Sequence, residues 1–139
     1  MRIKPTPQLL AVIMLALLTA CQSAADTPEA RVFFTSPAEG ASVSSPVHVT
    51  LGAENFTVEP AGEIKAGAGH LHIMVDADCL KPGEVIPKDD THLHYGKGQV
   101  EADLELAPGS HTLCLQAADG AHFALEGAGL TQKITITVK

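Results

Sequence analysis

Alternation of apolar and polar residues is the main pattern in the sequence after residue 30. Residues 70–76, HLHIMVD, place Leu71, Ile73 and Val75 in one row and His, Met and Asp side chains in the other. Residues two apart in a strand lie on the same face, so this segment predicts a strand with one face in the core. Short segments that also suit strands are residues 31–37, 41–46, 47–55, 98–109, 110–119 and 132–139.

These seven segments predict an all-β fold. None shows a sustained helical period, and turn residues such as Pro108 and Gly109 separate them. About seven short strands in about a hundred residues are typical of an immunoglobulin-like antiparallel β-sandwich. We therefore expect residues 31–139 to form one such domain, with long loops at residues 54–69 and 80–90 where function would reside.

The N-terminal segment predicts export. Arg2 and Lys4 precede an unbroken apolar run, residues 9–18, that is too short to span a membrane and fits the hydrophobic region of a secretory signal peptide. The residues that follow, LTAC, match the lipobox of bacterial lipoproteins and end at Cys21. The alternative is a plain signal peptide with a chance cysteine.

The lipobox resemblance implies the organisation of the N-terminus. It implies a lipoprotein signal peptide at residues 1–20, and a lipidated Cys21 that opens a flexible tether at residues 21–30. The membrane would then be a partner through the lipid anchor, and the domain would face the periplasm in the bacterial cell envelope. Residue 22 is Gln and not the Asp that retains lipoproteins in the inner membrane of enteric-type bacteria, which favours the outer membrane.

The charge of the exported chain argues against nucleic-acid binding. Cleavage after residue 20 removes Arg2 and Lys4 from 9 basic residues and leaves all 16 acidic residues, for a formal charge of −9. Such a surface repels phosphate backbones and tolerates metal cations and basic partners. Two cysteines remain, Cys79 and Cys114, and an even pair in an exported domain predicts a disulfide, with free thiols or a thiolate ligand as the alternatives.

Two His-X-His pairs are the candidate site. His70 and His72 share one face of a predicted strand, and His92 and His94 share one side of the segment THLHY. Two such pairs brought together supply four nitrogens, which suits zinc as a tetrahedron or copper(II) as a tetragonal site. The sequence does not show that the two pairs meet.

Four further residues could contribute to this site. The thioether of Met74 would favour copper(I), or Met74 could simply pack in the core. Asp76 could ligate the metal or orient an imidazole through a hydrogen bond. His111 and His122 are reserve ligands.

The sequence contains no strong enzyme motif. A nucleophile elbow, a phosphate-binding glycine loop and an HExxH pair are all absent. A metal-binding module is therefore expected over an enzyme. The alternative function is a non-metal envelope interaction or structural module, without a cofactor, in which the histidines hydrogen-bond within the fold.

The sequence resembles the bacterial exported family known as domain of unknown function 4399. The resemblance extends over about residues 31–139, and its most specific parts are the two His-X-His pairs, Gly98-Gln99-X-Glu101 and the stretch from Pro108 to Leu113. Members often have three consecutive histidines where this chain has His70, Leu71 and His72. The resemblance implies a fold and an exported compartment, and its name assigns no activity.

Overall fold

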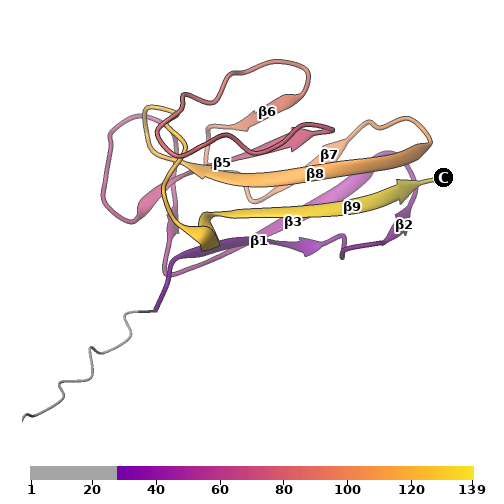
Figure 1. Cartoon of the computed structure of the whole chain (residues 1–139), viewed down its shortest axis with the longest axis horizontal. Coiled ribbons are helices and arrows are strands. Elements are labelled where there is room, and N and C mark those ends of the chain that lie inside the picture. The colour runs from indigo at the N-terminus through magenta and orange to yellow at the C-terminus, as the bar shows by residue number, and fades with distance from the viewer. Residues whose placement is uncertain (1–27) are drawn as a thin grey trace, which may run out of the picture.

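A computed structural model describes residues 28–139, which form two β-sheets packed face to face (Figure 1). The predicted signal peptide, Cys21 and most of the predicted tether lie outside the described residues, so these assignments stay predictions. Among residues 28–139 the structure has no helix that is long and apolar enough to cross a membrane.

Within residues 28–139, nine strands make up the two sheets. The first sheet has the order β1-β3-β7, and the second has the order β2-β9-β8-β5-β4, with β6 also paired to β5. Most pairs are antiparallel, whereas the short strands β2 and β4 run parallel to β9 and β5. The strands are β1 (Arg31–Ser36), β2 (Ser42–Val43), β3 (Val47–Glu54), β4 (Thr57–Val58), β5 (Ala68–Val75), β6 (His92–Tyr95), β7 (Glu101–Leu104), β8 (Gly109–Ala118) and β9 (Thr131–Val138).

The main core lies between the two sheets. Its residues are the inward rows that the alternation predicts, among them Val49, Leu71, Ile73, Leu115 and Ile136, each at most 1% exposed. Burial of these rows stabilises the sandwich and fixes the register, because a slip by one residue would turn every apolar side chain outward. The all-β sandwich expected from the sequence is confirmed. Among residues 28–139, the buried residues of this core lie between Val32 and Val138.

Loops cover the outer face of β5. All eight residues of this strand are buried, on both faces, although the alternation predicts only one buried face. A second apolar cluster lies on the outer face and consists of Met74, Ile86, Cys114, Ala118 and Ala124. The outer row of β5 is therefore enclosed, and its two histidines lie beneath protein.

A disulfide joins Cys79 to Cys114, as the sequence predicts. It links the loop after β5 to β8 across a sequence separation of 35 residues. The side chain of Gln116 supports the same loop, because it accepts a hydrogen bond from the Leu80 amide and donates one to the Leu80 carbonyl. The loop that covers the outer face is thus fixed at its start.

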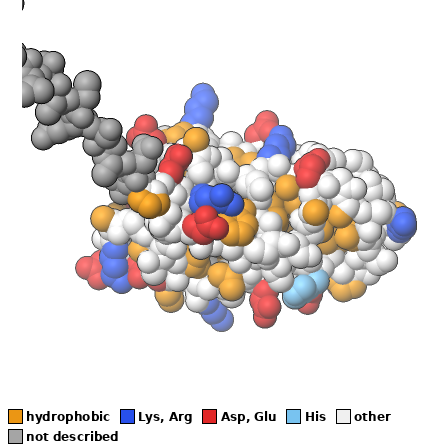
Figure 2. Space-filling view, turned by 90° about the horizontal axis from the view of Figure 1, so that it is seen from below, with side chains coloured by type: hydrophobic (Ala, Val, Ile, Leu, Met, Phe, Trp, Pro, Cys, Tyr) orange, Lys and Arg blue, Asp and Glu red, His pale blue; other side chains and the backbone are white. Residues whose placement is uncertain are grey.

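Charged side chains are dispersed over the surface. On the face in Figure 2, basic and acidic side chains alternate with apolar atoms and form no large area of one sign. His48 belongs to this exposed surface, where its ring bonds the carboxylate of Asp103 on the neighbouring strand. The exposed position agrees with its place in the polar row of β3.

Candidate metal centre

Strand β5 places two imidazoles on the covered outer face of the larger sheet. His70 and His72 are two residues apart, so both rings project to the side opposite Leu71 and Ile73. Both histidines are 0% exposed. Gly69 allows the close packing at this end of the strand, because a Cβ there would lie 2.0 Å from the Ala118 carbonyl oxygen.

Strand β6 adds the third imidazole. The antiparallel register pairs His72 of β5 directly with His94 of β6, which puts both rings on the same face of the sheet. His94 is partly exposed. Gly96 leaves space for its ring, since a Cβ at Gly96 would lie 2.2 Å from the Cε1 and Nε2 atoms of His94.

The fourth imidazole comes from the loop after β8. His122 has a φ of 73°, in the left-handed region that histidine adopts more often than most residues. Asp119 shapes this turn, because its carboxylate accepts hydrogen bonds from the amides of Ala121 and Phe123. The carbonyl of His122 accepts a further bond from the Ile86 amide. The backbone is therefore held from two sides in the conformation that directs His122 toward the strands.

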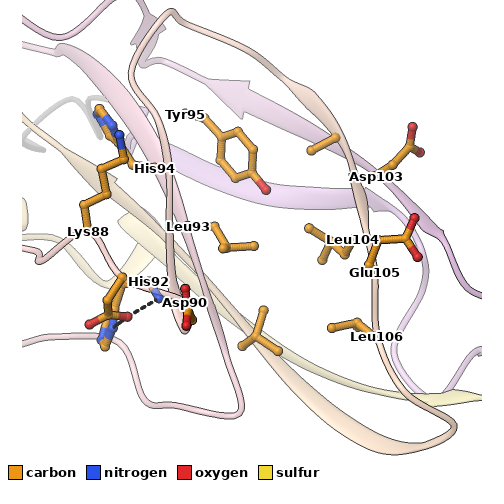
Figure 3. Close-up of a pocket in the computed structure, with 13 residues that line it drawn as sticks. Lys88, Asp90, His92, Leu93, His94, Tyr95, Asp103, Leu104, Glu105 and Leu106 are labelled. Carbon is orange, nitrogen blue, oxygen red and sulfur yellow. Dashed lines mark hydrogen bonds and ion pairs between the residues drawn. The ribbon is translucent and has the colours of Figure 1, made fainter.

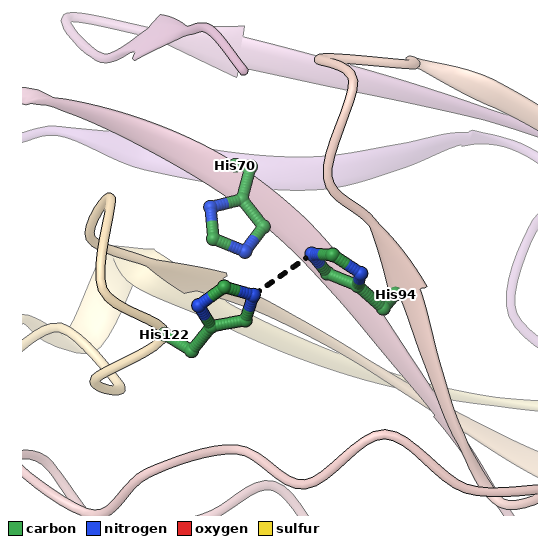
Figure 4. Close-up of side chains that lie close together, drawn as sticks. All are labelled: His70, His94 and His122. Carbon is green, nitrogen blue, oxygen red and sulfur yellow. Dashed lines mark hydrogen bonds between the residues drawn. The ribbon is translucent and has the colours of Figure 1, made fainter. Parts of the chain in front are cut away.

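The four rings converge, and Figure 4 shows three of them, His70, His94 and His122. Centroid separations for the six ring pairs run from 4.7 Å to 5.9 Å. The Nε2 atoms of His70 and His72 are 2.9 Å apart, and those of His94 and His122 are 3.1 Å apart. Ligand nitrogens of His70, His94 and His122 all lie within 4.8 Å of one another. We refer to His70, His72, His94 and His122 as the histidine cluster.

Burial favours the neutral form of three imidazoles in the cluster. Loss of hydration, together with the nearby rings of His122 and His94, lowers the pKa of His70 to about 4. Loss of hydration and the surrounding imidazoles lower the pKa of His72 to about 3. The pKa of His94 is also lowered, by burial first and then by His122 and Lys88. These three imidazoles are uncharged at neutral pH, which is the form that binds a metal ion.

The cluster satisfies only part of its hydrogen-bonding groups, because Nε2 atoms pair within it between His70 and His72 and between His94 and His122. His70 Nδ1 and His72 Nδ1 are buried and have no hydrogen-bond partner among residues 28–139. Buried polar atoms are nearly always paired, so unpaired ones call for a ligand, an ion or a water. Neutral imidazoles each present one lone pair, and lone pairs that converge in a buried space favour a cation.

The structure separates the predicted site residues. His70, His72 and His94 lie together, and the reserve ligand His122 completes the cluster. His92 lies apart from them, because its register partner is Met74 and its ring bonds the Asp89 carboxylate at 2.9 Å. That bond from His92 is the first cause of a lowered pKa for Asp89.

The three other candidates have structural roles. Met74 is 0% exposed and packs in the apolar cluster of the outer face. Asp76 accepts hydrogen bonds from the ring of His111 at 2.8 Å and from the Thr112 amide at 2.9 Å. These bonds occur beyond the end of β5, so Asp76 orients His111 and contacts none of the cluster imidazoles.

Comparison with known proteins identifies one family. The family described as "Domain of unknown function (DUF4399)" matches residues 49–139, a range that includes β5, β6 and the loop of His122. No curated protein and no solved structure gives a significant match. The matched range therefore includes all four residues of the histidine cluster, and the description of the family names no function.

Proposed function

The chain belongs to the family of domains of unknown function named DUF4399, and we propose that it binds one zinc or copper(II) ion through His70, His72, His94 and His122. The observation that carries this proposal is the convergence of four imidazole rings, two of which, His70 and His72, are fully buried and each leave Nδ1 without a hydrogen-bond partner among residues 28–139. Zinc–nitrogen bonds of about 2.0–2.1 Å place tetrahedral ligand nitrogens about 3.3 Å apart. The two Nε2 separations of 2.9 Å and 3.1 Å are close to that spacing.

The ligand count favours holding or delivering a metal over catalysis. Catalytic zinc sites use three protein ligands and keep one position open for water or substrate, whereas structural sites are filled by four. Four imidazoles would fill a zinc tetrahedron. His94 and His122 are partly exposed while His70 and His72 are fully buried, so an ion would enter and leave on the side of His94 and His122.

The proposal includes a place in the bacterial cell envelope. Support comes from the lipobox that ends at Cys21 and from the Cys79–Cys114 disulfide, which is typical of oxidising compartments. In bacteria that carry the full chain, Cys21→Ser should move the protein from the membrane fraction to the soluble fraction. Equal membrane retention of the two forms would contradict lipid anchoring at Cys21.

Titration calorimetry tests the metal site. The protein starting at Gln22 keeps all the described residues, 28–139, and should bind zinc or copper(II) one to one at neutral pH with micromolar or tighter affinity. His94→Asn and His122→Asn should each weaken binding by at least about tenfold, because each removes a ligand. Asn at residue 122 also tolerates the left-handed backbone, so that variant isolates the loss of the imidazole.

The control variant is His92→Asn. It removes a histidine from the same strand as His94 without touching the cluster, so its affinity should match that of the unmodified protein. Absence of metal uptake at micromolar concentration would overturn the proposal. The histidines would then be structural, and the Asn variants would change thermal stability alone. An equal loss of affinity in His92→Asn would overturn the ligand set.

A further inference from the structure

A groove runs along the open side of the sandwich, between strands β6 and β7. These strands belong to different sheets, and among residues 28–139 β6 pairs only with β5 and β7 pairs only with β3. Each strand therefore has one edge without a strand partner, although at β6 the amide and the carbonyl of His92 bond to Asp89. An edge of this kind can accept an added strand from another chain.

The groove contains a pocket with an apolar floor. Its volume is about 430 Å³, within the range of small-ligand and side-chain pockets. Leu93 and Tyr95 project across it from β6 toward Leu104 and Leu106 (Figure 3). Burial raises the pKa of the Tyr95 hydroxyl to about 12, so this group stays protonated as a hydrogen-bond donor.

The rim of the groove is acidic. Four carboxylates and one amine line it, from Asp89, Asp90, Asp103, Glu105 and Lys88. Asp89 is bonded to His92 and Asp103 to His48, whereas Asp90 and Glu105 are exposed and form no ion pair within residues 28–139. The charge that complements this rim is positive.

We propose that the groove binds an extended basic segment of a partner protein, added as a strand to the free edge of β6. Side chains of an added strand alternate between the two faces. One row of the segment would be apolar and would enter the pocket between the sheets. Lysine or arginine side chains would reach Asp90 and Glu105 at the rim. The pocket shares one residue, His94, with the histidine cluster, whereas its apolar floor and its rim carboxylates lie outside the cluster.

The only tyrosine of the chain provides the measurement. The sequence has one Tyr and no Trp, so the emission of Tyr95 reports occupation of the groove by peptides that lack aromatic residues. The protein starting at Gln22, with EDTA present, is titrated with an acetylated, amidated Lys-Leu-Lys-Leu-Lys peptide and with the corresponding Glu-Leu-Glu-Leu-Glu peptide. The basic peptide should give a saturable change, and the acidic peptide should give none. Amide NMR shifts should change along β6.

Charge-reversal variants test the rim. Glu105→Lys and Asp90→Lys alter exposed side chains, and each should lower the affinity for the basic peptide by about fivefold or more. Glu126→Lys makes the same change of charge at an exposed residue away from the groove and should leave affinity unchanged. The proposal is overturned if the basic peptide gives no saturation below about 1 mM. Equal binding of the two peptides, or an equal loss in Glu126→Lys, also overturns it.

Discussion

The histidine cluster depends on two residues that carry no imidazole. Gly96 leaves the space that the ring of His94 occupies, and Asp119 holds the turn of His122 through two backbone hydrogen bonds. Neither residue would be selected as a site residue from its type. Their importance follows from distances between atoms that are remote in the sequence, and the sequence alone does not supply those distances.

Gly96→Ala is expected to weaken metal binding and to preserve the fold. The new methyl would lie 2.2 Å from two ring atoms of His94, so the ring must move. Zinc affinity measured by calorimetry should fall by about tenfold or more, as when the support of a ligand is lost. Lys97→Ala, at the exposed neighbouring residue, is the matched control and should bind normally. Equal affinity in both variants would mean that His94 is not a ligand.

The pKa of His111 is raised, in contrast to the lowered pKa values of His70, His72 and His94. Its two ring nitrogens face the Asp76 carboxylate and the Ala107 carbonyl, both acceptors, so the ring is held as the protonated form. The bond to Asp76 is the first cause of its raised pKa. The pKa of Asp76 is lowered, since hydrogen bonds from His111 and Thr112 outweigh the opposing effect of burial.

The His111–Asp76 pair predicts a specific dependence of stability on pH. A histidine whose pKa is raised by folding stabilises the folded state fully at pH values below its pKa in the unfolded state, 6.5. That contribution is lost as the pH rises through its pKa in the folded state. An aspartate whose pKa is lowered by folding stabilises the folded state at pH values above its pKa in the unfolded state, 3.8. That contribution is lost as the pH falls through its pKa in the folded state. The pair should therefore contribute most between about pH 4 and about pH 6.5.

Urea unfolding with EDTA present measures this contribution. The difference in unfolding free energy between the unmodified protein and His111→Asn should shrink from about pH 6 to about pH 9. The change of this difference with pH should stay below about 1 kcal/mol, because Asp76 is 51% exposed and solvent screens the pair. A difference that grows with pH would show that the ring is neutral in the folded state.

At the scale of elements, the alternation of apolar and polar residues predicts the strands well. It does not predict which strand faces are buried by loops. The inward row Leu71, Ile73 and Val75 follows from period two and is confirmed. The opposite row was expected to face outward, but its members His70, His72 and Met74 are buried, because loops 77–90 and 119–126 pack over them. Loop packing depends on long-range contacts such as the disulfide and the bond between Ile86 and His122. No periodic signal in the sequence encodes these contacts.

Alternation also fails to identify the fourth member of the cluster, His122, for the same reason. His92 has the correct alternation with His94, but the register places it beside Met74, two residues along the strand from His72. His122 lies in an Asp-Gly-Ala-His turn that has no strand period. A turn residue reaches a site through its backbone conformation, here a φ of 73°, and pattern matching between strands does not detect it.

Removal of the disulfide should affect both stability and metal binding. Closing a loop of 35 residues contributes about 4 kcal/mol in the chain-entropy treatment, so Cys79→Ala with Cys114→Ala should lower the unfolding free energy by about that amount. The freed loop also carries Ile86, whose amide holds His122, so zinc affinity should fall by about tenfold.

Asp78→Asn is the control for the disulfide variant. It lies next to Cys79 and loses only an exposed contact with Lys133, so neither quantity should change. Urea unfolding and calorimetry measure the two effects separately. Unchanged zinc affinity in the disulfide variant would show that the covering loop does not position His122.

At the scale of the whole molecule, the cluster joins three separate parts of the chain. His70 and His72 come from β5, His94 from β6, and His122 from the loop after β8. The two-sheet architecture could be predicted from the number and length of apolar segments. The sheet order could not, because it depends on pairings between distant strands. An ion bound by all three parts would stabilise the complete fold, since the unfolded chain cannot present the same site.

Metal addition should therefore raise the melting temperature of the domain. Zinc at a hundred times its dissociation constant adds about 2.7 kcal/mol to the unfolding free energy. For a domain of this size, that increase raises the melting temperature by about 10 °C. EDTA should reverse the shift, and magnesium, which prefers oxygen ligands, should not produce it. The double variant His94→Asn with His122→Asn should lose the shift, whereas His48→Asn, which alters an exposed histidine, should retain it. An equal shift in the double variant would place the zinc on the acidic surface and not in the cluster.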